Sequence, residues 1–502
     1  MTRHDVDPAF TAMPLRLLAD AALQRARDLR VGHADFRLEK LRSQHLELRD
    51  GVLQGAHDSE QLGLCVRVVL DGTWGFASTD ELTPEAAVRT AEEAVRVAQV
   101  SAAINAERIE LADEPVHDDV TWVSDYEQDP FAVPVAEKVD RLGTWSRRLL
   151  ASPVVDHVSA ALQQVVENKF YADLAGTSTT QQRVRLEPWL TAYGTDPTGT
   201  RFDSMATLAP PVARGYEYLV GGYDWAGELA RLPEHLEHKL AAPSVEPGSY
   251  DLVIDPTNLW LTIHESVGHA TELDRALGYE ANYAGTSFAT YDQLGRLAYG
   301  SEQMSVTGDR TTPHGLATIG FDDDGVAGQQ WDLIRDGTLV GYQVDRRMAA
   351  MKQMDRSNGC AYADSPAHVP IQRMANVSLR PDPDGADLDG LIGGVEHGIY
   401  VVGDKSWSID MQRFNFQFTG QRFFAIENGR LAGQLRDVAY QATTTDFWGS
   451  MAAVGGPDTW RLGGTFNCGK AQPGQGAPVS HGCPAALFRD VRVLNTAAEA
   501  GR

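Results

Sequence analysis

The sequence predicts an α+β protein in which a mixed α/β N-terminal domain precedes a β-rich, antiparallel C-terminal domain. Three observations support this fold class: a length of 502 residues, helical and strand patterns that alternate early in the chain, and strand patterns with tight turns that dominate its second half. At roughly 150 residues per domain, such a chain has room for two or three hydrophobic cores. The proline- and glycine-rich stretch AAPSVEPGSY is the best boundary, so we divide the chain into residues 1–245 and 246–502.

The first half alternates helices with antiparallel strands. Leucine and alanine recur at helical spacing from Leu15 to Leu29, which predicts an opening helix. Two strand patterns, 36–48 and 62–70, are each followed by an Asp-Gly pair, a dipeptide that tolerates the positive φ angles of hairpin turns. Thr83 and Pro84 then suit the N-cap and first residue of a second helix.

The remaining elements follow from turn signals. The acidic, proline-interrupted stretch 107–134 predicts an irregular connection over the surface, and a further helix and strands follow it to about Tyr193. In the second half, turn dipeptides at 324–325, 336–337 and 428–429 separate strand patterns. Alternation of apolar and polar residues over 406–433 predicts an antiparallel meander.

Composition excludes several classes of function. The chain has 44 Lys and Arg against 69 Asp and Glu, a formal net charge of −25, and no basic stripe offsets it. Because such a charge repels phosphate backbones, we expect no direct binding of nucleic acid. No segment approaches the roughly 20 apolar residues of a membrane span, and no signal-peptide core is present, so we expect a cytoplasmic protein without a membrane partner. Four cysteines are too few for a disulfide scaffold, which favours metal binding or nucleophilic chemistry for any cysteine with a special role.

The strongest chemical pattern is HESVGH at residues 264–269, on a helix that Asp255 and Pro256 are expected to begin. It resembles the H-E-x-x-H motif of zinc peptidases, except that His264 and His269 are five positions apart instead of four. On a regular α-helix, a spacing of four separates side chains by about 40° and a spacing of five by about 140°. A shared metal therefore requires a deformed helix such as a π-bulge, which Gly268 would make easier. Otherwise both histidines are ordinary residues of a packed helix.

Further ligands could come from the C-terminal segment 467–483, which contains Cys468, His481 and Cys483. Zinc requires at least three protein ligands. Because the segment is rich in glycine and proline, we expect neither a regular strand nor a helix there. Two alternatives to metal binding stay open: structural buried cysteines, and a thiol hydrolase in which Cys468 is the nucleophile and His481 its base.

These residues resemble a known family. Over nearly all of its length the chain resembles the TldD/PmbA family of metallopeptidases, in particular the TldD-type, metal-binding members. The matching segments are RDGVLQG, GLCVRVVLDGTWGFAST, HESVGHATELD, GTSFA, GFDDDG, IRDGTLVGY and the terminal CGK. Because the other member type usually lacks the metal motif, the intact motif favours a catalytic role.

The resemblance implies a zinc site with His264, His269 and Cys468 as ligands and Glu265 as the general base. Two histidines and one thiolate leave a fourth position for water, as in catalytic zinc sites. Zinc would lower the pKa of that water and polarise the scissile carbonyl, while Glu265 would take the proton and pass it to the leaving amine.

Four neighbouring residues are left without a firm role. His481 and Cys483 do not belong to the family pattern, and we expect both to be largely dispensable for zinc binding. Glu272 and Asp274 lie just beyond the second histidine, where each either orients a ligand or is solvated on the helix surface.

The resemblance further implies hydrolysis of peptides or unfolded segments, and assembly with a PmbA-type (TldE) partner or with a second copy. A peptide would bind as an added strand at a sheet edge near the metal, with broad sequence tolerance. A non-catalytic regulatory or binding subunit is the alternative class, because the family has also been described as a modulator of DNA gyrase.

Overall fold

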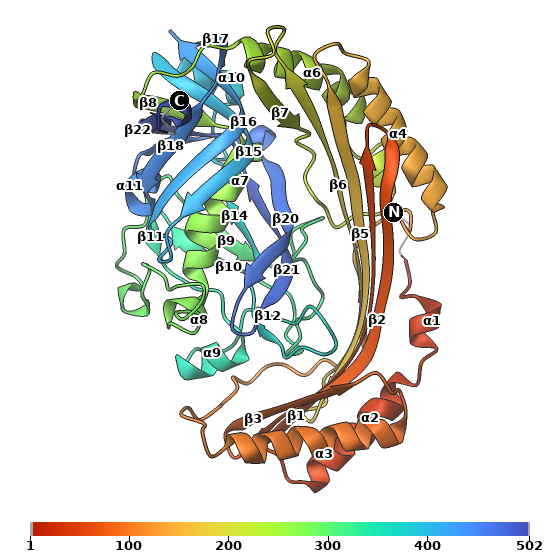
Figure 1. Ribbon diagram of the computed structural model, residues 1–502. Coiled ribbons are helices and arrows are strands. Elements are labelled where there is room, and N and C mark those ends of the chain that lie inside the picture. Colours follow the sequence, from red (N-terminus) through yellow and green to blue (C-terminus); the bar gives the residue numbers. More distant parts are fainter. Residues whose placement is uncertain (1–3, 500–502) are drawn as a thin grey trace.

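The N-terminal half of the computed structural model, which describes residues 4–499, is built on one long curved sheet whose concave side lies toward the C-terminal half (Figure 1). The strand order is β3-β2-β1-β5-β6-β4, with β7 beside β6. The strands are β1 (His33–Arg49), β2 (Val52–Leu70), β3 (Thr73–Thr79), β4 (Val120–Val123), β5 (His157–Asp173), β6 (Ser178–Thr195) and β7 (Phe202–Ala206).

The predicted hairpins of this sheet are confirmed. Asp50 and Gly51 join β1 to β2, and Asp71 and Gly72 join β2 to β3. All four residues have positive φ angles, between 51° and 81°, as two-residue hairpin turns require.

Helices cover the sheet at both ends (Figure 1). At one end α2 (Leu15–Asp28) and α3 (Pro84–Ser101) pack on β1 and β2, and Thr83 caps α3 as predicted. At the other end α4 (Val135–Leu150) and α6 (Trp225–Ala241) pack on β5 and β6. The short helices α1 (Pro8–Thr11) and α5 (Glu217–Val220) complete this half.

The expectation of a purely irregular surface connection over 107–134 is wrong in part. Residues Val120–Val123 form β4, which pairs in parallel with β6. Ile109, Ala112 and Tyr126 are buried, because isolated apolar residues within an acidic stretch still find a core to pack against.

A barrel-like sheet dominates the C-terminal half and confirms the α+β fold class. Strands β15, β8, β22, β18 and β16 follow one another, and pairing between β15 and β16 closes the ring. The strands of this sheet are β8 (Gly248–Ile254), β15 (His397–Ile409), β16 (Asn415–Glu427), β17 (Arg430–Leu435), β18 (Val438–Thr443), β19 (Met451–Val454) and β22 (Ala486–Asn495). The predicted meander is β15-β16-β17, although β15 also pairs in parallel with β8.

Smaller sheets and short helices surround this barrel. One sheet has the order β11-β10-β9-β14, and β12 pairs with β13. Their strands are β9 (Val306–Asp309), β10 (Gln330–Arg335), β11 (Thr338–Leu339), β12 (Ala361–Tyr362), β13 (Ile371–Gln372) and β14 (Asn376–Leu379). The helices are α7 (Pro256–Ile263), α8 (Leu273–Ala276), α9 (Arg346–Met351), α10 (Leu388–Gly393), α11 (Thr444–Gly449) and α12 (Thr496–Glu499).

The C-terminal segment that was expected to be irregular forms a hairpin instead. It consists of β20 (Arg461–Lys470) and β21 (Gln475–Cys483), paired with each other. Its glycines serve packing: a Cβ atom on Gly463 would lie 2.4 Å from the Trp260 ring, and one on Gly482 would lie 1.9 Å from the Trp460 ring. Glycine in this segment therefore allows a strand to lie close to indole rings. A rule that takes glycine as a sign of a turn does not predict this role.

Two further expectations can be compared with the structure. The turn at Asp336-Gly337 joins β10 to β11 and the turn at Asn428-Gly429 joins β16 to β17, whereas Asp324-Gly325 closes only the isolated bridge between Phe321 and Ala327. The division of the chain at residue 245, which lies between α6 and β8, stays a prediction.

Within residues 4–499, no helix combines the length and the apolarity needed to cross a bilayer.

Candidate metal centre

The motif HESVGH lies where a regular helix changes its winding. Asp255 caps α7 by accepting a hydrogen bond from the amide of Thr257 at 2.9 Å, with Pro256 in the first turn, as predicted. The α-helix ends at Ile263, and residues His264–Gly268 form a π-helix that runs into the 3₁₀ turn His269–Thr271. The deformation that a five-residue spacing requires is therefore present.

Side chains satisfy the backbone carbonyls that the π-turn leaves free. Gln343 donates to the carbonyl of Gly268 at 2.7 Å, and the Tyr299 hydroxyl donates to that of Ser266. A Cβ atom on Gly268 would lie 2.6 Å from the sulfur of Met374, so glycine lets this neighbour approach. The change of winding is thus stabilised by tertiary contacts.

The π-turn brings His264 and His269 to one side, and β20 adds Cys468. One ligand atom from each of the three residues lies within 4.8 Å of the others. Cys468 Sγ is 3.7 Å from His269 Nε2. All three residues are buried, so a metal held here would be shielded from bulk water.

A chain of hydrogen bonds fixes the orientation of His264. A carbonyl oxygen only accepts, so His481 Nδ1 donates its hydrogen to Val377 O at 2.8 Å. The other nitrogen of a neutral His481 is then an acceptor, and it takes a hydrogen bond from His264 Nδ1 at 2.7 Å. This leaves the Nε2 lone pair of His264 free for a metal. The contact revises the expectation that His481 is dispensable.

A carboxylate orients His269 in the same way. His269 Nδ1 donates to Glu272 at 2.8 Å, which leaves Nε2 facing Cys468. Lys470, fully buried, donates to Glu272 at 3.2 Å and to Asp274 at 2.8 Å. Both carboxylates are therefore buried and paired, and solvation of either on the helix surface is ruled out.

The electrostatic environment keeps the imidazoles neutral and the thiol protonated. Burial lowers the pKa of His269 to about 3 and holds that of His264 well below its usual value. Burial raises the pKa of Cys468 to about 11. Burial alone would raise the pKa of Glu272, but Lys470 and the bond to His269 outweigh it and hold that pKa below its usual range. Neutral imidazole is the form that binds metals, whereas the thiol would lose its proton on binding one.

Glu265 points to a different partner. It forms an ion pair with Arg413, a residue of the β15–β16 loop whose φ angle is 64°. Burial raises the pKa of Glu265, and Arg413 opposes this rise. Sequence reasoning missed Arg413, because a single arginine in a polar loop carries no motif. Cys483 lies away from the three-residue cluster, where its thiol faces the carbonyl of Pro256 at 3.6 Å.

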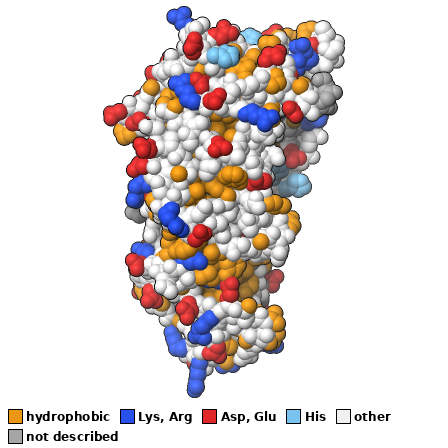
Figure 2. Space-filling model, turned by 90° about the vertical axis from the view of Figure 1, so that its left-hand side faces the viewer, with side chains coloured by type: hydrophobic (Ala, Val, Ile, Leu, Met, Phe, Trp, Pro, Cys, Tyr) orange, Lys and Arg blue, Asp and Glu red, His pale blue; other side chains and the backbone are white. Residues whose placement is uncertain are grey.

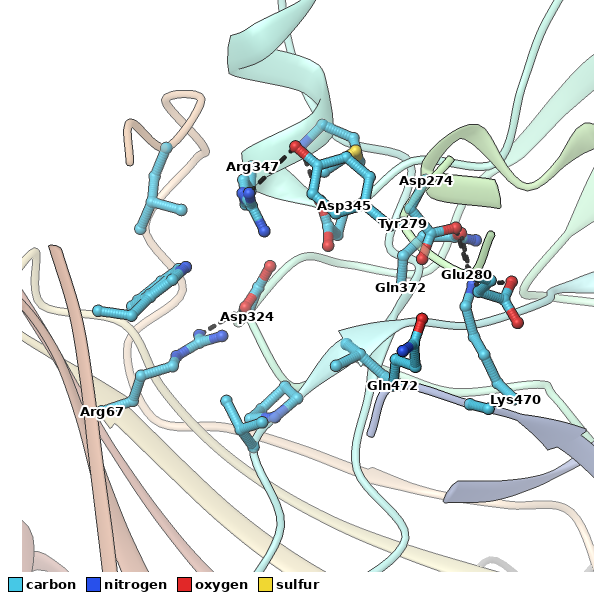
Figure 3. Close-up of a pocket in the computed structure, with 17 residues that line it drawn as sticks. Arg67, Asp274, Tyr279, Glu280, Asp324, Asp345, Arg347, Gln372, Lys470 and Gln472 are labelled. Carbon is cyan, nitrogen blue, oxygen red and sulfur yellow. Dashed lines mark hydrogen bonds and ion pairs between the residues drawn. The ribbon is translucent and has the colours of Figure 1, made fainter. Parts of the chain in front are cut away.

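A cavity of about 100 Å³ lies between the N-terminal sheet and the C-terminal half, and residues of both line it (Figure 3). Lys470 lies in its wall beside Asp274 and Glu280, and Arg67 from β2 forms an ion pair with Asp324 in another part of the wall (Figure 3). The three candidate ligands do not line this space. Lys470 connects this wall to the candidate ligands, because it also donates to Glu272, the hydrogen-bond partner of His269.

Comparison with known proteins identifies two family domains. The description "PmbA/TldA metallopeptidase domain 1" matches residues 34–98, and "PmbA/TldA metallopeptidase C-terminal domain" matches residues 247–495. The chain is 26% identical over 468 residues to a metalloprotease of Methanothermobacter thermautotrophicus, covering 93% of this chain and 96% of the relative. It is 21% identical over 425 residues to a protein of Saccharolobus solfataricus named zinc metalloprotease TldD homolog, covering 84% and 88% of the two chains.

Solved structures share the fold. A Thermotoga maritima protein described as a candidate modulator of a DNA gyrase superposes with a TM-score of 0.75 at 17% identity, covering 95% of this chain and 99% of the other. TldE from Thermococcus kodakarensis superposes with a TM-score of 0.68 at 16% identity, covering 94% and 98%. At this identity, the likeness concerns the fold alone.

Proposed function

The chain belongs to the PmbA/TldD family of metallopeptidases, and from this premise we propose that it is a zinc-dependent peptidase with His264, His269 and Cys468 as ligands and Glu265 as general base. The observation that carries the proposal is the π-turn, which brings two histidines five positions apart to one side, next to a cysteine from a distant strand. A helix of ordinary packing residues has no need of this deformation.

The donor set fits zinc better than the alternatives. Two imidazole nitrogens and one thiol sulfur suit zinc, whereas magnesium and calcium prefer oxygen ligands. The Nδ1 atom of His264 donates to His481 and that of His269 donates to Glu272. Metal-bound histidines usually have such a partner on the nitrogen that does not bind the metal. When bound, zinc would supply a Lewis acid and a water of lowered pKa.

Proton transfer falls to Glu265. Its carboxylate is buried beside His264, and no backbone amide competes for it among the described residues. In the structure the carboxylate is paired with Arg413. Glu265 can therefore act as a base only after this ion pair has loosened. A peptide carbonyl or carboxylate that draws the guanidinium away would leave Glu265 free to accept a proton and pass it to the leaving amine.

One edge of β20 has no strand beside it and could take a peptide. Within residues 4–499, β20 pairs only with β21, and Cys468 lies on β20. A peptide added along this edge would pass the proposed ligands through main-chain hydrogen bonds. This supports peptides or unfolded segments as substrates, since only an extended chain can pair in this way.

We extend the proposal to partners and location. TldE of Thermococcus kodakarensis shares the fold, which supports assembly with a TldE-type paralogue, with a pair of identical copies as the alternative. On the face shown in Figure 2, hydrophobic side chains gather over the middle and lower part, while Lys and Arg are scattered among Asp and Glu. This arrangement favours a protein partner over nucleic acid, and we propose a cytoplasmic location.

Two alternatives receive less support. A Cys468–His481 thiol hydrolase would need these residues in contact, but His481 bonds to His264 and burial raises the pKa of Cys468 to about 11. A purely regulatory subunit would have no use for a buried His-His-Cys cluster with a glutamate beside it.

The test compares cleavage of one protein in its folded and unfolded forms. The zinc-loaded wild type should cleave the unfolded form and spare the folded one, and zinc content should be about one per chain. Glu265→Gln should keep its zinc yet lose about 100-fold or more in rate, the scale of general-base catalysis. Equal cleavage of both forms would contradict the substrate proposal, and full activity of zinc-loaded Glu265→Gln would contradict the role of Glu265.

A further inference from the structure

A second cavity, of about 190 Å³, lies where the N-terminal sheet meets the beginning of α7. Strand β6 and the segment after β7 line one side, while α7, β15 and β20 line the other. Its walls carry two indole rings and two carboxyl groups: Trp189, Trp260, Glu187 and Asp404. None of the described residues that line it is a lysine or an arginine.

Neither carboxyl group forms an ion pair with a residue that the structure describes. Asp404 accepts a hydrogen bond from the indole N–H of Trp260 at 3.1 Å, and no described side chain donates to Glu187. Burial accordingly raises the pKa of Asp404 to about 6 and that of Glu187 to about 7. A cation that entered the cavity would keep both groups ionised, and the indole faces would attract it further.

The cavity lies next to the metal centre. Trp260 precedes His264 by four residues, one turn of α7, and their ring centroids are 6.4 Å apart. Trp260 also stacks on His481 at 6.1 Å. Two strands run from the cavity to the metal centre. Strand β15 carries Asp404 at the cavity and Trp407 beside Glu265. Strand β20 carries Gly464 at the cavity and Cys468 at the metal centre.

A peptide along the open edge of β20 would therefore meet both places. At about 3.3 Å per residue, a side chain in the cavity would belong to a position roughly two to four residues from the scissile bond. The net charge of −25 also draws basic peptides toward the molecule over a distance.

We propose that this cavity is a subsite for a lysine or arginine side chain of the peptide substrate. The inference rests on the proposed peptidase function and adds a preference to it. Main-chain pairing makes most positions of the peptide tolerant, whereas this one position selects a basic residue.

The experiment uses an unstructured peptide with a single arginine, and matched peptides with lysine, glutamine or glutamate at that position. The zinc-loaded enzyme should cleave the arginine and lysine peptides with a kcat/KM about tenfold or more above that for glutamine, with glutamate lowest. Glu187→Gln combined with Asp404→Asn keeps size and the acceptor for Trp260, and should bring the arginine and lysine peptides close to the glutamine value.

A matched control separates the subsite from the overall charge. Asp389→Asn with Asp458→Asn removes the same charge from a different cavity, and this variant should keep the full preference. If both double variants lose the preference alike, long-range attraction explains it and the subsite is refuted. Thermal unfolding of each variant identifies any that fail to fold, in which case the single variant Glu187→Gln takes its place.

Binding to Glu265→Gln, measured by calorimetry, keeps the two proposals apart. Tighter binding of the arginine peptide than the glutamine peptide, lost on adding Glu187→Gln and Asp404→Asn, supports the subsite even if the wild type cleaves nothing. Cleavage of all four peptides at similar rates would overturn the subsite and leave the peptidase function intact.

Discussion

At the scale of single residues, the tautomers of the two motif histidines follow from their neighbours. His269 donates to a carboxylate, and His264 donates to a histidine that itself donates to a carbonyl. Each arrangement leaves the Nε2 lone pair available and holds the ring in place. The metal centre is thus prepared by residues that contact the proposed ligands and are not themselves among them.

Substitution of the two C-terminal cysteines should separate ligand from bystander. Cys468→Ala should lose zinc and activity together, because the thiol is the third donor. Cys483→Ala should retain both, since its thiol contacts the carbonyl of Pro256 outside the cluster. Zinc content by elemental analysis and peptide hydrolysis check both variants; an empty site in Cys483→Ala alone would show that Cys483, not Cys468, is the third ligand.

His481→Ala should lower zinc affinity by about 10- to 100-fold, the effect of removing a residue that orients a ligand.

The sequence could predict the cluster but not all of its supports. His264, Glu265 and His269 form a local motif, and Cys468 stands in a recognisable CGK. Glu272 was a candidate because it lies near the motif. Arg413 and Lys470 reach the site from the β15–β16 loop and the hairpin, so only the folded chain reveals their contacts.

At the scale of elements, the β20–β21 hairpin shows why local rules fail for the C-terminal segment. Glycine and proline weaken isolated strands, yet this hairpin is held by contacts from outside. Ser480 donates its amide to Asn376 at 3.3 Å, and Gly482 donates to Ser378 at 2.9 Å, both on β14. The π-turn is the opposite case, because the spacing of the two histidines predicts it. Two histidines that share one metal must lie on the same side of the helix, and a spacing of five allows this only if the helix is deformed.

A methyl group on Gly463 should disturb the metal centre through the hairpin. The added Cβ would lie 2.4 Å from the Trp260 ring, which is itself stacked against His481. Overpacking of this kind costs about 1–3 kcal/mol. Gly463→Ala should therefore lower both the melting temperature and the zinc affinity. Gly476→Ala on β21 is the matched control, because nothing lies within 4 Å of its added Cβ, and it should match the wild type. Equal zinc affinity in the two variants would show that the hairpin position does not matter to the site.

At the scale of the whole molecule, buried charges join the N-terminal sheet to the C-terminal half. Arg37 and Lys169 bind Asp323 at 3.1 and 2.9 Å, and Arg67 binds Asp324 at 2.5 Å. The sequence predicted the GFDDDG segment only as a turn. The carboxylates of Asp323 and Asp324 are instead partners for cations on strands more than 150 residues earlier in the chain. No local pattern indicates pairing over that distance.

Glu39 lies within this junction and should make stability depend on pH. It is fully buried, with Arg37 and Lys169 each 3.7 Å away, and neither of its carboxylate oxygens has a hydrogen-bond partner among the described residues. Burial raises its pKa to about 7, although Lys169 and Arg37 oppose the rise. An unfolded glutamate has a pKa of about 4.3. Between these values the folded chain holds a proton that the unfolded chain has lost, so stability falls as pH rises through this window and levels off above it.

Glu39→Gln replaces this carboxyl group with an amide that does not titrate, so the stability of the variant should no longer fall in this pH window because of residue 39. Urea unfolding between pH 4.5 and 8 measures the effect: relative to the variant, the wild type should lose stability as pH rises toward about 7, with no further change above. Glu60→Gln, on the exposed part of β2, is the matched control and should follow the wild-type profile. A constant difference between wild type and Glu39→Gln across the whole range would mean that Glu39 stays ionised in the folded protein. In that case Arg37 and Lys169 would outweigh the cost of its burial, and the junction would act as a balanced ionic network at every pH in the range.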